Sequence, residues 1–245
     1  MSDGLLLFAR YAYPPNRLGY CGPSDSAGLL GYLGEGAADQ GLRELGQRFE
    51  GAYPYLLLIA RANGIADPFD RRVVEAYWIG NALLERVRPE GFLENLRERF
   101  RPRMDGREFE WMTSVLPLGA RPHHNFHVFD VYRRAGLMRD ERAIIALDRM
   151  DQCRISWGRV VTADGPELVV ARSPLVLRGG ALALDAPVPA RVTRHLTAAG
   201  AFDDARPGDY VSIHWGWACQ RLDRRALAAL VRATSRALAH TNTTL

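Results

Sequence analysis

The sequence predicts an α+β protein, with an all-helical part over residues 1–149 and a strand-rich part over residues 150–245 that ends in a helix. Three observations lead to this prediction. Apolar residues recur at steps of three and four in the first part, short apolar runs separated by turn residues follow, and helical spacing returns at the C-terminus. The 245 residues, 47% of them hydrophobic and 24% charged, suffice for one large domain or two small ones.

The strongest helical pattern runs over residues 70–87. Val73 and Tyr77 lie one turn apart on its apolar face, and Pro68 and Pro89 flank the segment. Pro89 also opens the next expected helix, because proline is well tolerated in the first turn. Helices are further expected over residues 29–49, 52–62, 89–100, 109–115, 126–132 and 141–150.

Short strands with turns between them are expected after Cys153. Asp164-Gly165 separates the apolar runs 159–161 and 167–171, a pattern typical of a β-hairpin. Such closely spaced short strands favour a small barrel over a layered α/β fold. Asp223 is a candidate N-cap for the final helix. The apolar stripe of that helix consists of Leu227, Leu230, Val231, Thr234 and Leu238.

Composition and charge argue against several classes of protein. The 32 basic residues, all of them arginine, exceed the 28 acidic ones by four, and the excess lies in residues 150–245. Such a small net charge gives little support to nucleic-acid binding. No apolar stretch is long enough to span a membrane, and the N-terminus lacks the apolar segment of a signal peptide. We therefore expect a cytoplasmic protein without membrane contact, in which three cysteines do not form a disulfide framework.

Two motifs surround Cys153 and His214. Residues 153–161 read Cys-Arg-Ile-Ser-Trp-Gly-Arg-Val-Val, and residues 207–218 read Pro-Gly-Asp-Tyr-Val-Ser-Ile-His-Trp-Gly-Trp-Ala. In this order, and with a C-terminal helix behind them, they resemble the HypC/HupF family of [NiFe] hydrogenase assembly chaperones. The resemblance covers residues 153–240, and the second motif is the more specific of the two.

The resemblance implies an OB-like β-barrel that works with a HypD-like partner. In that family the two proteins carry iron with its cyanide and carbon monoxide ligands and deliver it to the large subunit of a [NiFe] hydrogenase. A cysteine binds the iron and a nearby histidine supports the site, and the match places these roles on Cys153 and His214. A soft thiolate suits low-valent iron, and a neighbouring imidazole lowers the pKa of a thiol or accepts its hydrogen bond.

The sequence therefore predicts a chaperone or metallochaperone rather than an enzyme, and the side chains of Cys153 and His214 are expected within a few ångströms of each other. Whether the chain carries iron or only grips a partner is left open by the sequence. Two positions depart from the family pattern. Cys153 lies inside the chain instead of at a processed N-terminus, and Trp157 stands where the family has proline.

A second group of candidate residues lies in the helical part. Cys21 sits in a loop rich in glycine, proline and aromatic residues, and His123, His124 and His127 follow Pro122. Histidines three and four positions apart on a helix suit one metal ion, although they equally suit capping and hydrogen bonding in a core. The alternative function is thus a metal- or thiol-dependent enzyme that uses Cys21 with these histidines.

Three tryptophans of the strand-rich part, Trp157, Trp215 and Trp217, are candidate partner-binding residues. A third and weaker hypothesis makes them stacking platforms for single-stranded nucleic acid. The balanced charge of residues 1–149 argues against it. Cys219 is interpreted as a packed thiol, with metal ligation as the less favoured alternative.

Overall fold

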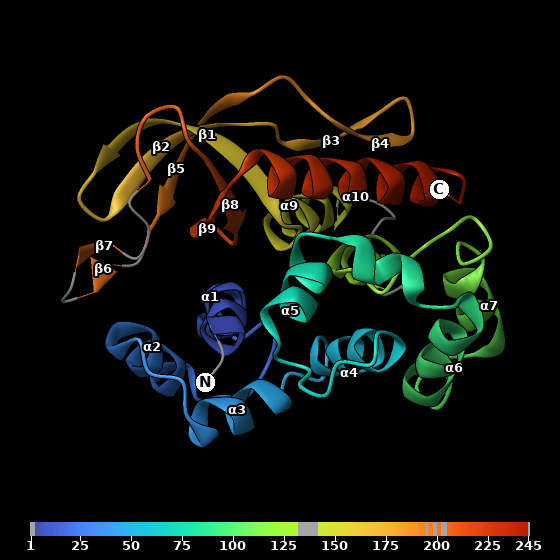
Figure 1. Ribbon diagram of the computed structural model, residues 1–245. Helices are drawn as coiled ribbons and strands as arrows, with labels where there is room; N and C mark the ends of the chain where they lie inside the picture. The colour runs from blue at the N-terminus through green and yellow to red at the C-terminus, as the bar shows by residue number, and fades with distance from the viewer. Residues whose placement is uncertain (1–2, 132–141, 195, 198–199, 202–204, 245) are drawn as a thin grey trace.

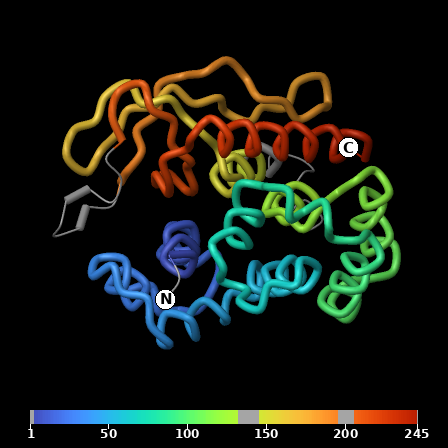
Figure 2. Tube along the Cα trace, viewed as in Figure 1, coloured from blue at the N-terminus to red at the C-terminus, as the bar shows by residue number. Residues whose placement is uncertain are grey.

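The computed structural model describes residues 3–131, 142–194, 196–197, 200–201 and 205–244 (Figure 1). It has helices in the N-terminal part, then strands, then a C-terminal helix, which confirms the expected α+β class. Strands and α10 lie on one side of the molecule, and most of the N-terminal helices lie on the other (Figures 1 and 2). The helices are α1 (Asp3–Arg17), α2 (Ser26–Glu35), α3 (Gln40–Gln47), α4 (Tyr53–Ala62), α5 (Arg71–Trp78), α6 (Pro89–Phe100), α7 (Gly106–Thr113), α8 (His124–Phe126), α9 (Arg142–Cys153) and α10 (Arg224–Asn242).

Aspartate caps start many of these helices. The side chains of Asp25, Asp39, Asp70, Asp105 and Asp223 each accept a backbone N–H in the first turn, at α2, α3, α5, α7 and α10 respectively. Such a cap satisfies a donor that has no partner within the helix. The N-cap expected at Asp223 is therefore confirmed.

The continuous helix predicted over residues 70–87 was wrong. In the structure, the segment comprises α5 and a 3₁₀ turn, η1 (Ala82–Arg86). Gly80, in the left-handed region at φ 92°, lies between the two. A Cβ atom at Gly80 would also lie 3.3 Å from Cβ of Ala233 on α10. Glycine thus permits both the sharp change of direction and the close approach of a distant helix.

Two other predicted helices also differ from the structure. The segment 29–49 is divided, because α2 ends at Gly36 with φ 64° and α3 begins anew after Asp39. The segment 126–132 consists of the end of α8 and the π-type turn η2 (His127–Val131), and Tyr132 lies outside the described residues.

Five strands form the main sheet. They are β1 (Ser156–Asp164), β2 (Glu167–Arg172), β5 (Val188–Thr193), β8 (Tyr210–His214) and β9 (Trp217–Leu222). Their order is β1-β2-β5-β9-β8, and β1 also pairs with β8, so the sheet closes on itself. The β5–β9 step is a single parallel pair, Thr193 with Trp217. Because β5 and β9 share only this one residue pair, the OB-like character of the sheet stays a prediction.

Two short hairpins accompany the main sheet, β3 (Leu175–Arg178) with β4 (Ala181–Leu184) and β6 (Leu196–Thr197) with β7 (Gly200–Ala201). The hairpin expected at Asp164-Gly165 is confirmed, since β1 and β2 pair up to Asp164 and Glu167 across it. Gly165 has φ 49°, which a tight turn of this kind requires.

The helical and strand-rich parts share one core. Helix α9 runs across the predicted boundary near residue 150 and ends at Cys153. Ile155, Cys219, Leu222 and Leu230 belong to the same buried cluster as the apolar residues of the N-terminal helices. The boundary therefore marks a change of secondary structure and not a gap in packing. None of the helices within the described ranges is long and apolar enough to cross a lipid bilayer.

A buried ion-pair network holds the end of α9 against the sheet. Asp151 Oδ1 accepts from Arg154 Nε at 2.8 Å, and Oδ2 accepts from Arg172 Nη1 at 2.9 Å. The backbone N–H of Leu175 also donates to Oδ1, at 2.9 Å. The Arg154 side chain is only 1% exposed, so its charge depends on this carboxylate for compensation.

Replacing Asp151 by alanine is expected to lower the free energy of unfolding by about 3–5 kcal/mol, because it leaves a buried guanidinium without its counterion. Urea denaturation at neutral pH measures the change. Glu167→Ala is the matched control, since it removes the partner of the exposed Arg191 and should cost less than about 1 kcal/mol. Equal losses in the two variants would contradict the role given to Asp151.

Candidate metal centre

The side chains of His124, Cys153 and His214 meet between the helical and the strand-rich part. One ligand atom of each lies within 4.8 Å of the others. His124 begins α8, Cys153 ends α9 and His214 ends β8, so three separate elements contribute. The expected proximity of Cys153 and His214 is confirmed. Within the described residues, this trio is the only group of three or more histidine, cysteine or acidic side chains placed to hold a metal ion.

His214 presents an unused nitrogen to this site. Its Nδ1 lies 2.7 Å from the backbone carbonyl oxygen of Tyr11 in α1, so Nδ1 carries the proton and donates it. In the neutral ring, Nε2 then has a free lone pair. This Nε2 is buried and makes no hydrogen bond of ordinary geometry among the described residues, and the nearby Cys153 backbone raises the pKa of His214 in opposition to burial. Histidines that bind metal typically donate their other N–H in this manner.

His124 faces the same point from the helical part. Its Nε2 lies 2.9 Å from the carbonyl oxygen of Cys153 and 3.8 Å from the Cys153 Sγ. Its Nδ1 lies 3.1 Å from the hydroxyl of Tyr77. The ring of Trp78 packs against both histidines, with centroid distances of 4.7 Å to His124 and 5.6 Å to His214. Aromatic packing thus keeps water from both imidazoles.

Burial sets the protonation states of the trio. It lowers the pKa of His214 to about 4 and that of His124 well below the usual value. Both imidazoles are therefore neutral near pH 7, which is the form that binds metal. Burial also raises the pKa of the Cys153 thiol to about 12. A thiolate at this position thus needs a bound cation to form at neutral pH.

The second site expected in the helical part is divided in the structure. Cys21 is exposed. His123 caps α8, because its Nδ1 accepts the backbone N–H of Asn125 at 3.0 Å. His127 is stacked on His124 with a centroid distance of 6.2 Å, outside the trio. Only His124 of this predicted group joins a cluster of possible ligands, and that cluster is the one around Cys153.

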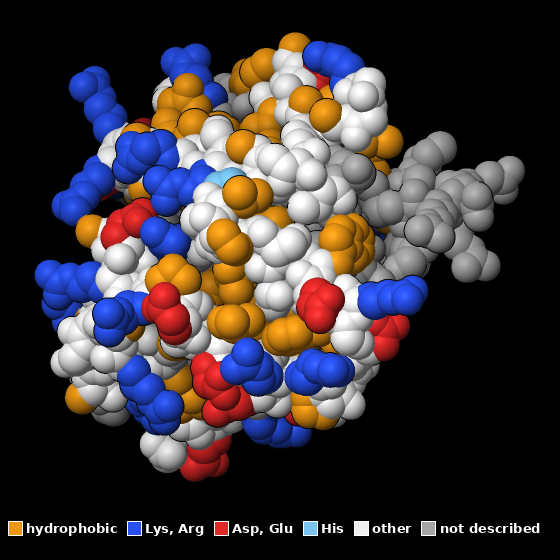
Figure 3. Space-filling view, turned by 90° about the vertical axis from the view of Figure 1, so that its right-hand side faces the viewer, with side chains coloured by type: hydrophobic (Ala, Val, Ile, Leu, Met, Phe, Trp, Pro, Cys, Tyr) orange, Lys and Arg blue, Asp and Glu red, His pale blue; other side chains and the backbone are white. Residues whose placement is uncertain are grey.

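The candidate partner-binding tryptophans pack against the helical part of the chain itself. Trp157 and Trp217 contact its apolar core, and Trp217 lies edge-on to Tyr13 at 5.6 Å. Trp215 stacks on Tyr20 with a centroid distance of 4.3 Å. Stacking on nucleic acid would require these contacts to break. Figure 3 shows arginine and acidic side chains on one face with apolar side chains between them, which is not a continuous basic surface.

Trp215 has the only positive φ of a non-glycine residue in the part of the chain that the structure describes, at 49°. It directly follows His214, and its backbone N–H donates to the carbonyl oxygen of Gln152 at 2.9 Å. A strained residue of this kind persists only where its surroundings hold it. Cys219, in contrast, is fully buried in the core, in agreement with its interpretation as a packed thiol.

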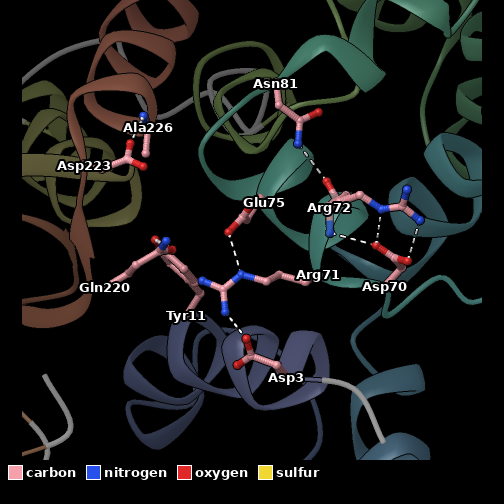
Figure 4. Close-up of polar contacts among 10 residues, drawn as sticks. All are labelled: Asp3, Tyr11, Asp70, Arg71, Arg72, Glu75, Asn81, Gln220, Asp223 and Ala226. Atoms are coloured by element: carbon pink, nitrogen blue, oxygen red, sulfur yellow. Dashed lines mark hydrogen bonds and ion pairs between the residues drawn. The ribbon is translucent and has the colours of Figure 1, made fainter.

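An open groove of about 1020 Å³ lies between α5, η1 and α10. On its wall, Arg71 pairs with both Asp3 and Glu75 (Figure 4). Gln220 lines the groove and accepts a hydrogen bond from the Tyr11 hydroxyl at 3.2 Å. The Tyr11 carbonyl in turn binds His214, so two residues, Gln220 and Tyr11, lie between the groove and the trio.

The metal-free protein is expected to lose stability as the pH falls from about 6.5 to about 4. Burial lowers the pKa of His123, His127 and His214 to about 4, so in this range the unfolded chain takes up protons that the folded chain does not. The loss reaches about 3 kcal/mol for each histidine, and above the unfolded pKa these groups cause no pH dependence. Urea denaturation across this range measures the slope.

The control for this prediction is His127→Leu, which removes one of the titrating groups and keeps a bulky side chain. Its unfolding free energy should fall less steeply over the same range. A wild-type profile that is flat between about pH 6.5 and about pH 4 would contradict the neutral state of the buried histidines.

The comparisons with known proteins concern the whole chain. A search of curated proteins and a search of solved structures gave no match. The resemblance of residues 153–240 to the HypC/HupF chaperones accordingly stays a prediction. The model of a family of unknown function, DUF6390, matches residues 1–245, and so includes both the helical and the strand-rich part. The chain therefore belongs to the DUF6390 family.

Proposed function

We propose that the protein is a cytoplasmic accessory protein of [NiFe] hydrogenase maturation, a HypC-like chaperone that holds an iron fragment at Cys153. The fragment, iron with cyanide and carbon monoxide ligands, is its cargo. It passes to or from a HypD-like partner or the immature hydrogenase large subunit. The observation that carries this proposal is the meeting of Cys153 with His214, which lie far apart in the sequence within two separate motifs.

The chemistry of the two side chains supports this role. The Cys153 thiol is protonated in the absence of cargo, because burial raises its pKa to about 12. Iron with strong π-acceptor ligands is a soft partner for a thiolate, and its charge compensates for the lost proton. The neutral Nε2 of His214 then supplies a second donor or accepts a hydrogen bond at the same point.

Cargo exchange would involve the aromatic pair beside the site. Cys153 is half-buried, and the side chain of Trp215 interacts with its thiol. Trp215 in turn stacks on Tyr20 at 4.3 Å. We propose that the pair separates during loading and release, and that a partner protein which binds beside Tyr20 supplies the energy. Such a step keeps a reactive fragment from solvent between encounters.

Cys153→Ala should abolish cargo binding. The protein is purified without oxygen from a host that produces a [NiFe] hydrogenase, and its iron content and infrared spectrum are recorded. Cyanide and carbon monoxide bands are expected in the wild type and not in Cys153→Ala, since the thiolate is the ligand that suits such iron. Cys219→Ala is the matched control, because Cys219 is buried in the core outside the trio.

Two results would count against the proposed function. Wild-type protein without iron or infrared bands, even when its partners are present in the same cells, would show that the chain is not a carrier. Infrared bands that persist in Cys153→Ala would show that another residue binds the iron.

A further inference from the structure

We infer that His124 is a third ligand of the centre, so that the chain binds a divalent transition-metal ion, such as Zn²⁺ or Co²⁺, through two imidazoles and one thiolate. This inference goes beyond the proposed function, because it needs neither an iron fragment nor a hydrogenase partner. It also assigns a role in metal binding to the helical part, since His124 belongs to that part and His214 belongs to the sheet.

The first step of the argument is the state of His214. Its donor contact to the Tyr11 carbonyl fixes the proton on Nδ1, and Nε2 is left with a lone pair. A buried polar atom without a partner is costly, and the great majority of such atoms are satisfied. What sets the trio apart is geometry, because this Nε2, the Cys153 Sγ and a ring nitrogen of His124 all lie within 4.8 Å of one another.

The second step concerns His124, whose neutral ring can carry its proton on either nitrogen. In one arrangement, Nε2–H donates to the Cys153 carbonyl and Nδ1 accepts from Tyr77. In the other, Nδ1–H donates to the Tyr77 hydroxyl, and this hydroxyl donates to the carbonyl of Gly51, which lies 3.1 Å away. The second arrangement turns the Nε2 lone pair toward the trio without any movement of heavy atoms.

A cation favours this second arrangement. With its lone pair exposed, Nε2 of His124 faces the carbonyl oxygen of Cys153 at 2.9 Å and the Sγ at 3.8 Å. Facing lone pairs repel each other unless a positive charge compensates for them. Tyr77 would then orient the His124 ring, as the Tyr11 carbonyl orients that of His214, so each ligand has its own outer hydrogen bond.

The third step is the choice of ion. The donors are two nitrogens and one sulfur, so the site suits Zn²⁺ and Co²⁺ and not Mg²⁺ or Ca²⁺, which prefer oxygen ligands. Binding also displaces the proton of the Cys153 thiol, which passes to solvent.

The test is a Co²⁺ titration of the full chain after removal of metals by a chelator. It is made in a Cys21→Ala background, because the exposed Cys21 thiol would otherwise offer an adventitious ligand. One equivalent of Co²⁺ is expected to produce thiolate-to-cobalt charge-transfer absorption. His124→Ala and His124→Gln should each weaken binding roughly tenfold or more, as should the corresponding changes at Cys153 and His214.

His127→Ala is the matched control, since His127 is a half-buried histidine that stacks on His124 but lies outside the trio. It should bind Co²⁺ as the parent does. Thermal unfolding of each variant separates ligand loss from misfolding. Added Zn²⁺ should raise the unfolding temperature of the parent and of His127→Ala, and it should raise that of His124→Gln much less.

Two outcomes would overturn the inference: no charge-transfer band in the parent, or unchanged Co²⁺ affinity and an unchanged Zn²⁺ shift in folded His124→Gln. These outcomes are distinguishable from failure of the proposed function. If the protein lacks cyanide and carbon monoxide bands but binds Co²⁺ through His124, the inference holds and the carrier role is wrong. The reverse result would retain the carrier role and lose His124 as a ligand.

Discussion

Tyr11 makes the contact on which the arrangement of the two parts depends. Its hydroxyl lies 2.7 Å from Ser212 Oγ in β8 and binds Gln220 in β9, while its ring stacks on Trp78 at 5.2 Å. Its backbone carbonyl accepts the proton of His214. One residue of α1 therefore contacts β8 and β9 of the sheet, packs against α5 and fixes the tautomer of a candidate ligand.

This arrangement leaves little independence to either part. The buried cluster of the N-terminal helices includes side chains from β1, β9 and α10, and the tryptophans of the sheet pack against α1 and the loop after it. A strand-rich part isolated from residues 1–149 would expose these apolar surfaces to water. The family match over residues 1–245 agrees with a unit that includes both parts.

The sequence was sufficient for the fold class and for the pair Cys153 and His214. Helical spacing and the hairpin at Gly165 are local signals, and the two motifs placed the cysteine and histidine in one site. The sequence was not sufficient where contact with a distant segment determines the local structure. The break at Gly80 depends on α10, which lies more than a hundred residues later.

His124 shows the same limit within the candidate centre. Spacing grouped it with His123 and His127, because residues three or four apart share a face of a regular helix. Here α8 covers only His124–Phe126 and gives way to a π-type turn, so the three imidazoles are directed to different neighbours. The signal that would have found its true neighbours is tertiary, namely the packing of Trp78 between α8 and β8.

The buried network around Asp151 has a consequence for Cys153, which lies two residues further along α9. Asp151 and Arg154 flank the cysteine in the chain, and Asp151 also binds Arg172 of the sheet and the backbone of Leu175. The main chain at Cys153 is thus immobilised before anything binds to its sulfur. When a ligand binds there, the protein therefore loses little conformational entropy. The affinity then reflects the match between donor and acceptor atoms instead of the cost of ordering a loop.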